Sequence, residues 1–193
     1  MEKINFIKTF IPQGDFREKY EHGGMMVRHL AAVLDEKMGA YECYECTVPI
    51  GEYDEGEIQK AFVEFSAKMD ALKLKQAKAD KIAEITAYDT SSSVNGFILN
   101  GLLVWLDKAT RVGLMNSTTI AKAAGQKTTT LWLGGIKLVV DCDKAIQLLS
   151  ALEMYALECF NVTASHKQAV SELTTVEEVE AYDYKAGYPK MLE

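Results

Sequence analysis

A long stretch without helix breakers constrains this chain more than any other feature. From Asp54 to Tyr88 the sequence has no proline, has no glycine after Gly56, and is dense in alanine, lysine, glutamate and leucine. These residue types favour helix, and a helix of this length is long for so small a protein. We therefore predict one long helix within residues 53–90, which connects an N-terminal region to a C-terminal region.

Large apolar residues in the first half of this helix recur at alternating spacings of four and three. They are Ile58, Phe62, Phe65, Met69 and Leu72. This spacing is typical of the a/d seam of a coiled coil, and also of a helix that lies on its own domain. Both interpretations stay open. The first predicts that the chain is a homo-oligomer and that these five side chains form its interface.

The residues before the helix favour strands. Residues 4–11, 25–33 and 40–48 are rich in β-forming side chains, and residues 35–39 (DEKMG) have the chemistry of a turn. We predict a small antiparallel β-meander over residues 1–52.

The residues after the helix alternate between hairpins and helices. Residues 89–93 (DTSSS) predict a linker, and Asn100-Gly101 and Gly134-Gly135 each lie between apolar runs, as in a tight hairpin. Two further helices are expected, one from Asp107 to Gly125 and one opening at Asp141 or Asp143. Their buried faces are predicted to consist of Val112, Met115, Thr119 and Ala123 in the first, and of Ala145, Leu148, Leu149, Leu152, Tyr155, Leu157 and Phe160 in the second.

A short helix capped by Thr174 or Thr175 and an extended tail over residues 185–193 complete the prediction. The fold class is therefore α+β: an N-terminal meander, a long connecting helix, and a hairpin–helix–hairpin–helix domain over residues 94–184.

Charge and hydropathy exclude several classes of partner. A formal charge of -7 and a pI near 5.1 argue against nucleic-acid binding, which needs a clustered basic surface. Lysines gather along the long helix, but a solvated helix face explains them better than a phosphate-binding stripe; they are Lys73, Lys75, Lys78 and Lys81. The sequence has no apolar run long enough to span a membrane and no basic, apolar leader. We expect intracellular synthesis.

Cys43-x-x-Cys46 is the strongest chemical candidate in the sequence, with possible companions elsewhere: Cys142, Cys159, His22, His29 and His166. A zinc knuckle normally lies on a tight turn, whereas this pair lies within a predicted strand, where odd spacing sends side chains to opposite faces. We therefore expect free, structural thiols. A cytosolic metal or thiol protein that uses Cys43 and Cys46 stays an alternative.

The sequence carries none of the common catalytic or cofactor motifs. It lacks a nucleophile elbow, a phosphate-binding loop, a dinucleotide fingerprint and a metalloprotease helix. We predict a protein without enzymatic activity, with no catalytic residues and no cofactor.

Residues 94–184 combine four features: Asn100-Gly101 before an apolar strand, Trp105-Leu106-Asp107 before a helix, a strand that carries Trp132, and the segment 173–180 (LTTVEEVE). In these features they resemble an uncharacterised domain family of tailed phages and prophages. The amino-acid sequence of Trp105–Met115 is similar to versions in Bacteroidales phages or prophages. Members often lie at the C-terminus of tail-fibre or tail-fibre-assembly-like proteins. The resemblance implies a virion protein of the tail or tail fibre whose partners are other tail or fibre proteins, or else an assembly chaperone that is absent from the mature particle.

Overall fold

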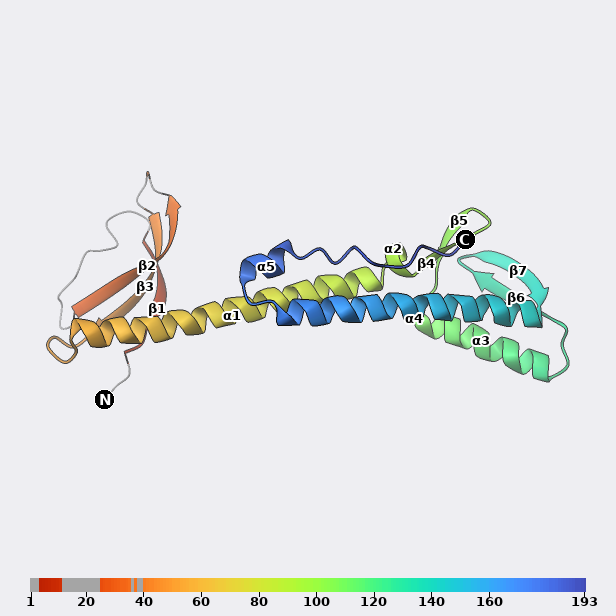
Figure 1. Ribbon diagram of the computed structural model, residues 1–193, viewed down its shortest axis with the longest axis horizontal. Coiled ribbons are helices and arrows are strands. Elements are labelled where there is room, and N and C mark those ends of the chain that lie inside the picture. Colours follow the sequence, from red (N-terminus) through yellow and green to blue (C-terminus); the bar gives the residue numbers. More distant parts are fainter. Residues whose placement is uncertain (1–3, 12–24, 36, 38–39) are drawn as a thin grey trace. The chain divides into compact units, whose positions relative to one another are not determined.

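A computed structural model describes residues 4–11, 25–35, 37 and 40–193. The chain divides into two compact units, Met1–Lys73 (unit 1) and Leu74–Glu193 (unit 2). The division falls inside α1 (Glu55–Asp89), the long helix predicted from the sequence. Strands come first, then this helix, then alternating hairpins and helices, which confirms the α+β class (Figure 1).

Unit 1 contains one antiparallel sheet of β1 (Ile7–Ile11), β2 (Met25–Asp35) and β3 (Ala40–Val48). The predicted strands are confirmed, but their order is β1-β3-β2, whereas a meander would place β2 at the centre. The connection between β1 and β2, residues 12–24, is longer than the roughly two to five residues of a hairpin loop. The chain therefore does not tie β1 to β2, and the mostly buried β3 takes the central position.

The first half of α1 covers one face of this sheet. Buried side chains of the sheet and helix form the core, and further apolar side chains of α1 pack around it; these are Phe6, Tyr44, Cys46, Val48 and Ile58, with Phe62, Phe65 and Met69 around them. Four of the five seam residues are thus used within unit 1, as expected for a helix on its own domain. Leu72 differs, because its side chain is 49% exposed.

Unit 2 is organised around α4 (Cys142–Glu172), which packs beside α3 (Lys108–Ala123) (Figure 1). One hairpin, β4 (Gly96–Leu99) and β5 (Leu102–Trp105), precedes α3. A second, β6 (Thr128–Leu133) and β7 (Ile136–Asp141), joins α3 to α4. The short helices are α2 (Ser92–Asn95) and α5 (Val176–Ala181).

Turns and caps in unit 2 follow the sequence closely. Asn100 and Gly101 have φ values of 52° and 79°, as a two-residue type I′ turn requires. Asp107 and Asp141 cap α3 and α4 through their carboxylates. Thr175 and Glu178 form a reciprocal capping box at the start of α5. These predictions are confirmed. The cap of α4 is Asp141 and not Asp143, and the cap of α5 is Thr175 and not Thr174.

The buried faces of α3 and α4 differ in part from the prediction. On α3, Val112, Thr119 and Ala123 are exposed, and the inward face instead consists of Arg111, Leu114, Met115 and Thr118. The ion pair between Arg111 and Glu153 turns this face toward α4.

On α4, Leu157 and Phe160 are 50% and 60% exposed. The buried face runs instead through Tyr155, Cys159 and Thr163, because positions four apart stay on one side of a helix.

The predicted linker (residues 89–93) and the predicted extended tail (residues 185–193) both make hydrogen bonds within unit 2. Ser91 caps α2, and the Asn95 side chain donates to the Asp89 carbonyl at 2.5 Å. In the tail, Leu192 accepts a backbone hydrogen bond from Ile98 of β4 at 2.8 Å. No helix within the described ranges is both long and apolar enough to cross a membrane.

Candidate binding pocket

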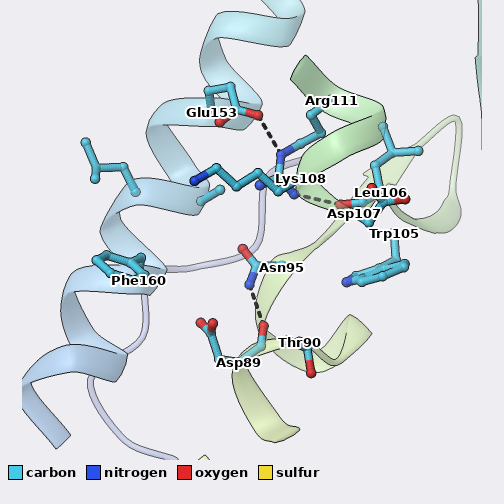
Figure 2. Close-up of a pocket in the computed structure, with 12 residues that line it drawn as sticks. Asp89, Thr90, Asn95, Trp105, Leu106, Asp107, Lys108, Arg111, Glu153 and Phe160 are labelled. Carbon is cyan, nitrogen blue, oxygen red and sulfur yellow. Dashed lines mark hydrogen bonds and ion pairs between the residues drawn. The ribbon is translucent and has the colours of Figure 1, made fainter. Parts of the chain in front are cut away.

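Unit 2 contains a pocket of about 440 Å³ between α4 and the junction of β5 with α3 (Figure 2). A ligand-sized pocket in proteins typically combines apolar walls with a few polar groups. Its lining comes from the end of α1, from α2, from the β5–α3 junction and from α4, and consists of Asp89, Thr90, Asn95, Trp105, Leu106, Asp107, Lys108, Arg111, Glu153, Ala156, Leu157 and Phe160.

Large apolar side chains form two walls of the pocket. Trp105 is the last residue of β5 and is 40% exposed, and Phe160 on α4 is 60% exposed. Figure 2 shows their rings on opposite sides of the space, with Phe160 on α4 and Trp105 on the other side. Leu157 adds an exposed aliphatic side chain one turn before Phe160. Exposed apolar side chains that gather around a concavity are typical of a binding surface.

Arg111 fixes the end of the pocket beside Glu153 and Leu106. Its Nε donates to Glu153 Oε1 at 2.8 Å, and its Nη1 donates to the Leu106 carbonyl at 2.6 Å. The Arg111 residue is only 9% exposed, so its charge needs this counter-ion. The two bonds tie the start of α3 and the end of β5 to α4, which fixes the spacing of the walls.

Lys108 differs from Arg111, because its side chain makes no ion pair or hydrogen bond with any residue that the structure describes. Lys108 begins α3, directly after the capping residue Asp107. Figure 2 shows its side chain extending across the pocket toward α4. The Asp107 carboxylate is already engaged by the Thr110 hydroxyl and backbone N–H at 2.6 Å and 2.8 Å. The Thr110 hydroxyl and N–H lower the pKa of Asp107. Lys108 is therefore the cation that a ligand could neutralise.

The opposite end of the pocket is polar. Asp89 accepts a hydrogen bond from the Thr163 hydroxyl at 2.8 Å through Oδ1. The Asn95 amide nitrogen donates to the Asp89 carbonyl, and the Asn95 amide oxygen faces the pocket (Figure 2). This end can therefore accept hydrogen bonds from a ligand.

Tyr155 and Cys159 support this end from behind. The Tyr155 hydroxyl donates to the Val94 carbonyl at 2.5 Å, and the Cys159 thiol lies 3.5 Å from the same oxygen. Burial raises the pKa of Tyr155 to about 12 and also raises the pKa of Cys159. Both groups stay protonated at neutral pH, so they keep donating to α2 and hold Asn95 in position.

The cysteine pair predicted as a chemical candidate lies in unit 1. Cys43 and Cys46 are buried in β3, and burial raises the pKa of both thiols. A raised pKa keeps a thiol protonated and a poor metal ligand or nucleophile. Among the residues that the structure describes, no three His, Cys, Asp or Glu side chains gather as metal ligands. His22 lies outside the described residues.

The possible companions of that pair are dispersed. His29 lies on β2 in unit 1, whereas Cys142, Cys159 and His166 lie in α4 of unit 2. His166 bonds the Tyr182 hydroxyl at 2.8 Å and the Ala186 carbonyl at 2.9 Å.

Two of the clustered lysines on α1 donate to carbonyls of other helices, and a third, Lys73, pairs with Asp70 on α1 itself at 3.7 Å. Lys78 Nζ donates to the Ser171 carbonyl at 2.7 Å, and Lys81 Nζ donates to the Glu180 carbonyl at 3.2 Å. These carbonyls lie at the C-terminal ends of α4 and α5, where a positive charge opposes the helix dipole. Lys78 and Lys81 thus attach α1 to the ends of two helices, which accounts for them without a phosphate ligand.

Few residues of the pocket were predictable from the sequence. Trp105, Leu106 and Asp107 entered only as part of the family resemblance, and Leu157 and Phe160 were expected in the core. An arginine on the inward face of α3 and a glutamate on α4 gave no pattern, because their pairing across the two helices is not local in sequence.

A comparison with protein-family models matches residues 76–186 to DUF4376, which is described as a domain of unknown function. The matched region contains every residue of the pocket. Searches of curated proteins and of solved structures gave no match.

Proposed function

This chain belongs to the DUF4376 family, and we propose that it is a non-enzymatic interaction protein of a tailed bacteriophage, in the tail or a tail fibre. The resemblance of residues 94–184 to a domain of tail-fibre and tail-fibre-assembly-like proteins supports the phage assignment. That region lies wholly within the family match. Other tail or fibre proteins are the proposed partners.

The pocket of unit 2 carries the interaction part of the proposal. Trp105, Leu157 and Phe160 expose 40%, 50% and 60% of their surface around one concavity. Keeping apolar surface in water is unfavourable by about 25 cal/mol per Å², so a partner that covers it gains affinity. Aromatic side chains are also enriched among the residues that dominate binding energy at protein interfaces.

The proposed protein is made in the host cytoplasm, assembles as a homo-oligomer and is carried in the virion. A close variant is a fibre-assembly chaperone, which would use the same pocket transiently and leave before the particle matures. The two variants differ in the fate of the protein and not in its chemistry.

Mass spectrometry of purified particles tests the proposal. Particles are prepared on a density gradient from a host that carries the gene, and the chain is quantified against the tail proteins. A tail component is expected to co-purify in fixed ratio to them. A chaperone is expected to be missing from particles yet bound to a fibre protein in the same cells. A chain that is absent from particles and binds no tail or fibre protein would overturn the proposal.

A further inference from the structure

We propose that the pocket of unit 2 binds an extended peptide segment in which an apolar side chain neighbours an aspartate or glutamate. This inference rests on the proposed function and names the part of the partner that is recognised. It follows from three features of the pocket: the placement of its apolar walls, the ammonium group of Lys108, which is unpaired within the described part of the chain, and the polar end beside Asp89 and Asn95.

The apolar walls form a seat for a side chain. Trp105 and Phe160 lie on opposite sides of the pocket, so they can enclose a group from two directions (Figure 2). Leu157 adds an aliphatic contact on the Phe160 side. A leucine, methionine or phenylalanine side chain fits this enclosure in shape and polarity.

Within this lining, Lys108 is the group that favours an acidic neighbour for that side chain. Arg111 is paired with Glu153 at 2.8 Å, whereas the carboxylates of Asp107 and Asp89 keep their charge and accept hydrogen bonds from Thr110 and Thr163. Lys108 remains without a partner in the described part of the chain, and its side chain crosses the pocket toward α4 (Figure 2). A ligand carboxylate beside the apolar seat would pair with the Lys108 ammonium group. The other cation of the lining, Arg111, is already paired with Glu153, so recognition of a ligand carboxylate depends on Lys108.

The end of the pocket beside Asp89 and Asn95 suits a peptide main chain. Asn95 is fixed by its bond to the Asp89 carbonyl, and its amide oxygen is available to accept a hydrogen bond. A main-chain N–H of the ligand provides such a donor. The volume of about 440 Å³ accommodates a few residues and not a folded element. The occupant is therefore a short extended segment, presented by a loop or a chain terminus of the partner.

A displayed library of random seven-residue peptides tests the inference on the full-length chain. The wild type, Lys108→Glu, Phe160→Glu and the double variant Trp105→Ala with Phe160→Ala are each immobilised and panned in parallel. The matched control is Trp132→Ala with Lys137→Glu, because Trp132 and Lys137 are an exposed tryptophan and lysine paired across β6 and β7, outside the pocket. Circular dichroism checks that every variant is folded; Phe160→Glu alters an exposed side chain and stays informative if Trp105→Ala does not fold.

The wild type and the control are expected to enrich the same peptides, with an apolar residue beside an acidic one. The Phe160 variants should lose more than about tenfold in affinity for them. Exchanging the acidic residue of a selected peptide for glutamine should weaken binding by about two- to fivefold, as for an exposed ion pair. Lys108→Glu should select lysine or arginine at that position instead.

Enrichment of the same acidic peptides by Lys108→Glu, or undiminished binding to the Phe160 variants, would overturn the inference. So would a wild type that enriches no peptide, including one that binds a glycan array through the pocket. These failures are distinguishable from failure of the proposed function, because the presence of the chain in particles does not depend on what the pocket selects.

Discussion

The core of unit 1 is rich in aromatic rings, whereas the main core of unit 2 is mostly aliphatic, and tyrosines pack in its smaller clusters. In unit 1, His29 stacks on Phe62 with ring centroids 3.6 Å apart, and Phe6 contacts both rings. In unit 2, side-chain caps start α2, α3, α4 and α5, and both hairpins use two-residue turns with positive φ.

The difference is one of degree between local and non-local specification, because a local cap, formed by Asp54 and Glu57, also starts α1 in unit 1. Caps and two-residue turns are encoded by residues close in sequence, so the elements of unit 2 are specified step by step. The core of unit 1 depends on contacts between strands and a helix that are distant in sequence. The family match, residues 76–186, falls within the locally specified unit. The following predictions test this contrast, from the largest expected effect to the smallest.

Leu149→Ala should destabilise unit 2 by about 2–5 kcal/mol, because Leu149 is fully buried in its main core and truncation leaves a cavity. Urea unfolding followed by circular dichroism measures the loss. Leu157→Ala, on the exposed side of the same helix, is the control and should stay within about 0.5 kcal/mol of wild type.

Hydrogen exchange of the same variants tests whether the units are independent. Leu149→Ala should leave the protection of β2 and β3 in unit 1 unchanged. Equal loss of protection in both units would contradict the division.

Thr175→Ala should reduce the free energy of unfolding by about 1 kcal/mol, because it removes the cap of α5. Thr175→Ser keeps the capping oxygen and should restore most of this loss. Equal stability of the two variants in urea titrations would show that the capping box contributes nothing.

Acidification should weaken unit 1. His29 Nε2 is buried without a hydrogen-bond partner, and burial lowers the pKa of His29 from 6.5. The folded state therefore binds this proton less readily than the unfolded state. The stability contribution is present above pH 6.5 and is lost as pH falls from there through the lowered pKa.

Hydrogen exchange of β2 and β3 at neutral and acidic pH measures this effect. His29→Phe should make the protection less dependent on pH, whereas His166→Gln in unit 2 should not. A pH response that survives in His29→Phe would assign it to another group.

Leu72→Glu should lower the oligomeric state without changing stability, if α1 forms an interface between copies. Leu72 is the one predicted interface residue that is largely exposed, whereas Ile58, Phe62, Phe65 and Met69 pack within unit 1. Light scattering coupled to size exclusion measures the mass. An unchanged mass would mean that this seam serves unit 1 alone.

The same contrast sets how much the sequence could predict. The turn at Asn100-Gly101 and the caps at Asp107 and Thr175 involve only residues that are close in sequence, so they were predictable. The β1-β3-β2 order was not, because nothing local chooses which strand pairs with β1. The inward face of α3 was misassigned because Arg111 is buried by pairing with Glu153 on another helix.

The pocket was unpredictable for the same reason. Phe160 fits an apolar helical stripe as well as a pocket wall, and only the position of α4 beside β5 and α3 distinguishes the two. Lys108 carries no sequence pattern of its own.

Site-specific photo-crosslinking in the host during phage production tests the proposed interaction through the pocket. A photoreactive phenylalanine analogue replaces Phe160 in one variant and Trp132 in a control. Position 160 is expected to crosslink to a phage tail or fibre protein, and position 132 is not. No crosslink from position 160, or a crosslink only to proteins unrelated to the phage tail, would contradict the proposal.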